Sequence, residues 1–141
     1  MKDSKQLVHL LNLASRKISK SFNERMAPSG LYAAQWTVIR YLFNNGPSTQ
    51  ITMSTYLGVE APTMTRTITR LEKSGLIVRK EGNDRREKII HLSDLALSKI
   101  PEWEIEITRF EEPLFDKLTD SEIESAKKVL ETIIHSLKQQ D

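Results

Sequence analysis

Apolar residues recur at helical spacing over the first part of the chain. Between residues 4 and 25 they follow one another at steps of four, three, four and four, which predicts an amphipathic helix carrying Leu7, Leu11, Ala14, Ile18 and Phe22. Pro28-Ser29-Gly30 breaks that helix. Three more helical segments follow, each with a glycine suited to end it: residues 32–43 before Gly46, residues 49–57 before Gly58, and residues 62–74 before Gly75.

The pattern changes after Gly75. Residues 76–80 (LIVRK) and 88–92 (KIIHL) are short and rich in β-forming residues, and the polar run between them contains Gly-Asn-Asp, which favours a turn. These segments predict a β-hairpin with a charged tip. A short helix, a tight turn, a longer helix and then a hairpin is the order of a winged helix-turn-helix.

Two long helices are expected after the hairpin, over residues 94–116 and 120–138. Pro101 lies inside the first and is expected to bend it or to mark a restart. Thr119 and Glu122 have the spacing of a capping box at the start of the second. That last helix has one broad apolar face: Ile123, Ala126, Val129, Leu130, Ile133, Ile134 and Leu137. The predicted fold class is therefore mostly α with a small β-wing, a winged helix-turn-helix flanked by terminal helices.

The 141 residues fit one domain, and their charge is unevenly spread. Residues 62–91 carry eight Lys and Arg against four Asp and Glu, whereas residues 101–141 carry five against eleven. A basic middle suggests a surface that faces a polyanion. The chain has no apolar run long enough for a membrane span and no signal-peptide pattern, so we expect a cytoplasmic protein without a membrane partner.

Residue types needed for catalysis or metal binding are absent or badly spaced. There is no cysteine, which excludes disulfides and thiolate metal sites. His9, His91 and His135 fall in three separate elements without zinc-site spacing. No nucleophile elbow or Gly-rich phosphate loop occurs. We expect no enzyme activity, no metal and no cofactor.

The predicted helix over residues 62–74 has two different faces. Met64, Ile68 and Leu71 share one face and are expected to pack inward. The opposite face carries Pro62, Thr63, Arg66 and Arg70, followed by Lys73, with Thr67 at its margin. The hydroxyl and guanidinium groups on this face can read base edges in a major groove. Taken alone, this pattern is equally typical of a solvated helix face.

The tip of the predicted hairpin carries a second candidate contact with DNA. Asp84, Arg85 and Arg86 lie in the loop, and Lys88 begins the second strand. An arginine held there can enter a narrow minor groove, and a nearby aspartate could orient its guanidinium. An isolated run of this kind is more often a loop kept soluble by charge.

The stretch from Pro62 to Ser93 resembles the signature region of the MarR family of transcriptional regulators. The matching elements are the Thr65-Arg66 pair, the run from Leu71 to Leu76, Asp84 with Arg86, and Leu92-Ser93. Residues 118–133 also resemble the last helix of that family. Two positions depart from its pattern: Pro62 stands where serine is common, and Ala96 replaces a glycine.

The resemblance implies a double-stranded DNA partner and a homodimer. Residues 31–93 would form the DNA-binding part of a single domain spanning 1–141, and residues 1–30 and 94–141 the dimerisation helices; the wide apolar stripes of both terminal helices favour the same interpretation. The operator would be an inverted repeat, and repression is the commoner outcome in the family. The resemblance also implies a small aromatic or anionic effector, for which the candidate pocket residues are His9, Trp36, Arg40 and Trp103.

An alternative is a winged-helix module that binds protein instead of DNA. Such modules generally lose the basic recognition face and the wing arginine, both of which this chain keeps.

Overall fold

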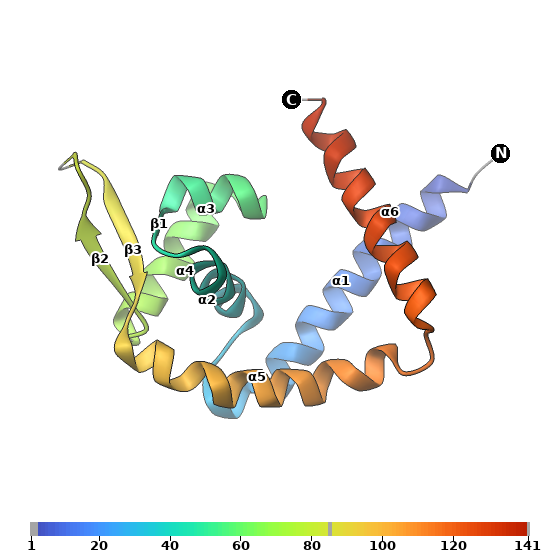
Figure 1. Cartoon of the computed structure of the whole chain (residues 1–141), viewed down its shortest axis with the longest axis horizontal. Helices are drawn as coiled ribbons and strands as arrows, with labels where there is room; N and C mark the ends of the chain where they lie inside the picture. The colour runs from blue at the N-terminus through green and yellow to red at the C-terminus, as the bar shows by residue number, and fades with distance from the viewer. Residues whose placement is uncertain (1–2, 85, 141) are drawn as a thin grey trace. The chain divides into compact units, whose positions relative to one another are not determined.

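The computed structural model describes residues 3–84 and 86–140, and most of them are helical (Figure 1). The elements in chain order are α1 (Ser4–Met26), the short 3-10 helix η1 (Ala27–Ser29), α2 (Ala33–Asn45), β1 (Ser48–Thr49), α3 (Gln50–Leu57), α4 (Ala61–Lys73), β2 (Ile77–Glu81), β3 (Lys88–Leu92), α5 (Asp94–Phe115) and α6 (Asp120–Lys138). The predicted mostly α fold with a small β-wing is confirmed. The chain divides into two units within α5, one ending at Ile107 and the other beginning at Thr108.

Local signals in the sequence fix the ends of α3 and α4. The Thr49 hydroxyl accepts a hydrogen bond from the Thr52 backbone N–H at 3.1 Å, which caps the start of α3. Gly58 ends α3 with φ 65°, and Gly75 follows α4 with φ 75°, a left-handed backbone that favours glycine. The helix-turn-helix therefore lies where the spacing of its glycines predicted it.

The hairpin belongs to a three-stranded antiparallel sheet in the order β1-β3-β2. Glu81 pairs with Lys88 next to the loop, and Ile77 with Leu92 at the other end. The sequence did not predict β1. Its two residues, Ser48 and Thr49, pair with Ile90 and Ile89 along the free edge of β3. The strand anchors the start of α3 to the wing.

The core of the first unit lies under α4. Met64, Ile68 and Leu71 are fully buried, as predicted from their spacing. Other large side chains that are buried in the first unit are Met26, Leu31, Val38, Ile39, Met53 and Ile90. Because α4 contacts α2, α3 and β2, its inner face is held from several sides. The opposite face of α4 is left exposed on a firmly placed helix.

Helix α5 runs without a break through Pro101, so the expected restart is wrong. Proline removes one backbone donor, but four buried side chains on this stretch hold the helix to the first unit: Ala96, Ile100, Trp103 and Ile107. At its start, the Ser93 hydroxyl accepts from the Ala96 N–H at 3.1 Å and donates to the Gly75 carbonyl at 2.6 Å. Ser93 thus joins α5 to the turn that follows α4.

The second unit contains the end of α5 and all of α6, and none of its described residues is buried. The capping box predicted at α6 is confirmed: Thr119 accepts from the Glu122 N–H at 3.1 Å, and Glu122 accepts from the Thr119 N–H at 2.9 Å. The backbone and side-chain hydrogen bonds from Thr119 lower the pKa of Glu122. No described helix of either unit is long and apolar enough to span a membrane.

Candidate nucleic-acid interface

The outer face of α4 carries most of the predicted recognition residues. Pro62, Thr63, Arg66 and Arg70 are all exposed. The Arg66 guanidinium donates from Nη2 to the Thr63 hydroxyl, one turn earlier, at 3.1 Å. This bond directs the Arg66 side chain along the helix surface toward the N-terminal end of α4. Arginine donors in this position suit the acceptors of a guanine base.

Thr67 is placed differently from the other four. It is 8% exposed, and its hydroxyl donates to the Thr63 carbonyl at 3.1 Å. Thr67 lies at the margin of the predicted face, and its side chain points toward the core. The hydrogen bond to the Thr63 carbonyl satisfies its hydroxyl there. The structure therefore does not bring Thr67 together with the exposed recognition residues.

The wing is tied to α4 by an ion pair. Arg79 of β2 lies 3.4 Å from Glu72 of α4, measured from Nε to Oε2, and both side chains are partly exposed. The distance allows charge attraction, but the Nε–H of Arg79 makes no well-oriented hydrogen bond among the described residues. The pair helps to set the hairpin against the recognition helix.

At the wing tip, Asp84 shapes the turn. Its carboxylate accepts from the backbone N–H of Arg86 at 3.1 Å, and its carbonyl accepts from the Glu87 N–H at 2.9 Å. The sequence suggested that Asp84 orients a guanidinium; the described part of the wing shows it holding the backbone instead. Arg86 is exposed, whereas Arg85 lies outside the described residues.

Lys88 is exposed but paired. Its Nζ lies 3.6 Å from Oε1 of Glu81, the residue opposite it in the hairpin. A surface pair of this kind is worth little, so Lys88 can exchange it for a phosphate at small cost.

A groove of about 540 Å³ separates the wing from the start of α3. It is lined on one side by Thr49, Gln50 and Ile51 and on the other by Arg79, Asp84, Arg86, Glu87 and Lys88. The sequence assigned no role to the first side. One sequence signal for that side was available: Thr49 is suited to cap a helix, which places Gln50 and Ile51 at the start of that helix.

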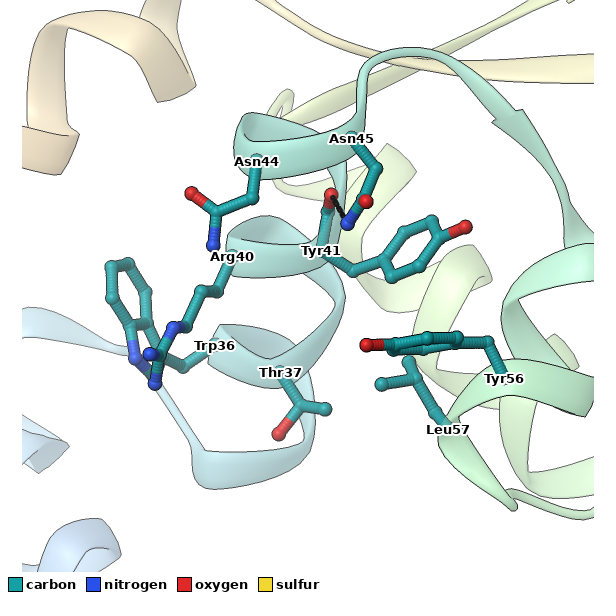
Figure 2. Close-up of a pocket in the computed structure, with 8 residues that line it drawn as sticks. All are labelled: Trp36, Thr37, Arg40, Tyr41, Asn44, Asn45, Tyr56 and Leu57. Atoms are coloured by element: carbon teal, nitrogen blue, oxygen red, sulfur yellow. Dashed lines mark hydrogen bonds between the residues drawn. The ribbon is translucent and has the colours of Figure 1, made fainter. Parts of the chain in front are cut away.

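A second pocket, of about 340 Å³, lies between α2 and α3 (Figure 2). It includes two of the four residues expected to hold an effector, Trp36 and Arg40. The rings of Tyr41 and Tyr56 lie against each other on one side of it, with centroids 5.2 Å apart and planes inclined at 52°. Its remaining lining residues are Thr37, Asn44, Asn45 and Leu57. The sequence missed the two tyrosines, because nothing in their spacing shows that α2 and α3 enclose a space.

The other two expected effector residues do not line this pocket. Trp103 is 5% exposed and packs against Trp36 from within the core. His9 is exposed on α1. Among the described residues, no group of three or more histidine, aspartate or glutamate side chains lies close enough to hold a metal ion.

The pattern that defines the MarR family matches residues 31–88, which include α2, α3, α4, β2 and the first residue of β3. Over 122 residues the chain is 42% identical to the uncharacterized HTH-type transcriptional regulator YwoH of Bacillus subtilis (strain 168), covering 86% of this chain and 89% of that protein. The chain belongs to the MarR family. It is a transcriptional regulator and not an enzyme, as the sequence predicted.

Solved structures of MarR regulators have the same fold. One from Methanosarcina mazei Go1 has a TM-score of 0.87 at 18% identity, covering 100% of this chain and 95% of that chain. A mutant E. coli MarR complexed with operator DNA has a TM-score of 0.82 at 22% identity, covering 91% of this chain and 93% of that chain. These likenesses support the assignment of α3, α4 and the hairpin as a winged helix-turn-helix.

Proposed function

We propose that this MarR-family regulator acts in the cytoplasm as a homodimeric repressor that binds an inverted-repeat operator and responds to a small molecule. The observation that carries the proposal is the two-sided character of α4. Its inner face is fully buried at Met64, Ile68 and Leu71, while Arg66 and Arg70 face outward. A helix held this rigidly presents its arginines to a major groove without first having to be ordered.

The wing supplies the second contact. Arg86 projects from a turn fixed by Asp84, next to a groove whose other side is the start of α3. An arginine in that position fits the negative potential of a minor groove beside the major groove that α4 enters. The operator in complex with E. coli MarR supports the same kind of partner for this fold.

The homodimer is supported by apolar side chains that one chain leaves uncovered. In α6, Val129, Leu130, Ile134 and Leu137 are between 42% and 57% exposed. In α1, Leu7, Val8 and Leu10 are between 44% and 56% exposed. Soluble monomers rarely leave such stripes in water. A second copy would cover them, and a two-fold dimer would place two α4 helices about 34 Å apart, at successive major grooves.

Ligand response is supported by the α2–α3 pocket. Trp36, Tyr41 and Tyr56 offer aromatic faces, and Arg40 offers a positive charge. A small aromatic anion suits these groups. Because Tyr56 belongs to α3, an occupant would act directly on the helix that packs against α4. Titration of the DNA complex with benzoate and related carboxylates tests this; release by wild type but not by Arg40→Ala is the expected result.

Selection of bound sequences from random duplex DNA tests the DNA-binding part of the proposal. We expect enrichment of an inverted repeat with half-sites one helical turn apart. A dimer making about 6–10 phosphate contacts should also lose roughly 10³–10⁵ in affinity between 50 and 200 mM salt. Salt-sensitive binding without enrichment would contradict sequence-specific recognition, and no binding at low salt would favour a protein-binding module.

A further inference from the structure

We infer that Gln50 is a positioning residue for base recognition: it fixes the Thr65 side chain so that the Thr65 methyl group contacts a thymine. The inference rests on the proposed operator binding. It adds a residue of α3 and a residue of α4 to those expected to decide which bases are read.

The two residues are joined across the helix-turn-helix. Nε2 of Gln50, the first residue of α3, donates to Oγ1 of Thr65 in α4 at 2.6 Å. The same Thr65 oxygen donates its proton to the Ala61 carbonyl, one turn earlier, at 3.0 Å. The hydroxyl is thus held by two partners in two different helices.

These bonds decide which group Thr65 presents. A threonine in a helix divides between two side-chain rotamers, because its hydroxyl can bond a carbonyl of the preceding turn. The Thr65 hydroxyl both donates to the Ala61 carbonyl and accepts from Gln50, and the two bonds together select one rotamer. Thr65 is exposed and cannot donate that proton to a base, so its methyl group is free for an apolar contact. In a major groove, the partner of a threonine methyl is the C5 methyl of thymine.

The location of Thr65 supports this role. It precedes Arg66 and lies in the first half of α4, the part of a recognition helix that meets base edges. The bond from Gln50 is exposed, and exposed hydrogen bonds add little to stability. Orientation, not stability, is therefore what Gln50 contributes.

The test uses the duplex selected by the wild-type protein. Each thymine is replaced in turn by deoxyuridine, which removes only the C5 methyl group. The wild-type protein should bind about fourfold more weakly when one particular thymine of each half-site is replaced, the value expected for one buried methyl group. Thr65→Ser keeps the hydroxyl and lacks the methyl, so it should show no loss at that thymine.

Gln50→Met keeps the length of the side chain and removes the hydrogen bond. If Gln50→Met folds poorly, Gln50→Ala is a second variant that lacks the bond. Both variants should lose less affinity than wild type when that thymine is replaced by deoxyuridine. Their response to replacement of the other thymines and their thermal midpoint should be unchanged. Thr132→Ser is the matched control: Thr132 makes the same back-bond, 2.8 Å to the Lys128 carbonyl, but lies on α6. It should keep the wild-type profile.

Three outcomes would overturn the inference alone: an enriched operator in which no thymine is sensitive, full sensitivity retained in Thr65→Ser, or full sensitivity retained in the Gln50 variants. Failure of wild type to enrich any sequence would instead overturn the proposed operator binding, and the inference with it.

Discussion

The indole rings of Trp36 and Trp103 meet edge to face, with centroids 6.4 Å apart and planes inclined at 79°. Trp36 lines the α2–α3 pocket, whereas Trp103 is buried on α5. The contact therefore links the proposed effector pocket to the helix that leads out of the winged helix. Aromatic pairs of this geometry add about 0.5–1.5 kcal/mol beyond the burial of their surface.

Trp103→Ala should lower the free energy of unfolding by about 3–5 kcal/mol, because it leaves a cavity in the core. Trp36→Ala should cost less, since Trp36 is already partly exposed. Urea unfolding at one fixed protein concentration compares the two, with Trp103→Phe as the control that keeps a ring. Equal losses for both alanine variants would show that Trp103 does not have the core role assigned to it.

Arg86→Ala should weaken operator binding by about 1–3 kcal/mol and leave the thermal midpoint unchanged, because Arg86 is exposed on the wing. Arg16→Ala removes the same charge from α1 and should leave the affinity close to that of wild type. Fluorescence anisotropy with a labelled duplex gives both affinities. Unchanged binding by a folded Arg86→Ala protein would remove the wing from the mechanism.

Arg66→Ala should relax sequence preference as well as weaken binding, by about 1–3 kcal/mol on the selected operator and by less on other sequences. Lys73→Ala, at the opposite end of α4, is expected to weaken all sequences alike through lost phosphate attraction. Competition between specific and random duplexes separates the two effects. An equal loss on every sequence would reassign Arg66 to the DNA backbone.

Ile134→Asp should convert the protein to monomers at micromolar concentration. Ile134 is 54% exposed within one chain, so the charge does little harm to the fold of a single chain but is costly in an apolar interface. His135→Asp places the same charge on the polar side of α6 and should leave the dimer intact. Analytical ultracentrifugation distinguishes the cases, and a dimeric Ile134→Asp protein would place the interface elsewhere.

Acid should weaken the start of α6. The pKa of Glu122 is lowered in the folded state. The contribution of this carboxylate to stability is therefore present above its unfolded pKa and is lost as the pH falls through its folded pKa. Glu122→Gln should flatten this part of the pH dependence of the thermal midpoint, measured by circular dichroism between about pH 6 and pH 2. Glu131→Gln, which lies outside the capping box, should keep the wild-type slope.

Helix boundaries followed from the sequence because they depend on local chemistry. Glycine after α3 and α4 and the Thr119–Glu122 box act within one turn of each end. The buried face of α4 followed from its periodicity for the same reason. Strand β1 did not, because two residues have no period of their own and pair only where β3 leaves an edge open.

The candidate site was predicted less completely, because it depends on contacts between elements. Periodicity placed Thr67 at a margin, but only packing decides that it is buried. The residues Trp36 and Arg40 share a pocket with two tyrosines from α2 and α3, whereas Trp103 lies behind it in the core. Likewise, the bond between Gln50 and Thr65 joins residues fifteen apart in the chain, a distance over which side-chain pairing has no sequence signature.

The most direct test of dimeric operator recognition is to change the spacing between the two halves of the selected operator. Insertion of about five base pairs, half a helical turn, turns the second half-site to the opposite face of the DNA. Binding should fall to the level of a single half-site, and insertion of a full turn should restore part of it. Equal affinity for all three spacings would contradict a rigid two-fold dimer with one α4 in each of two neighbouring major grooves.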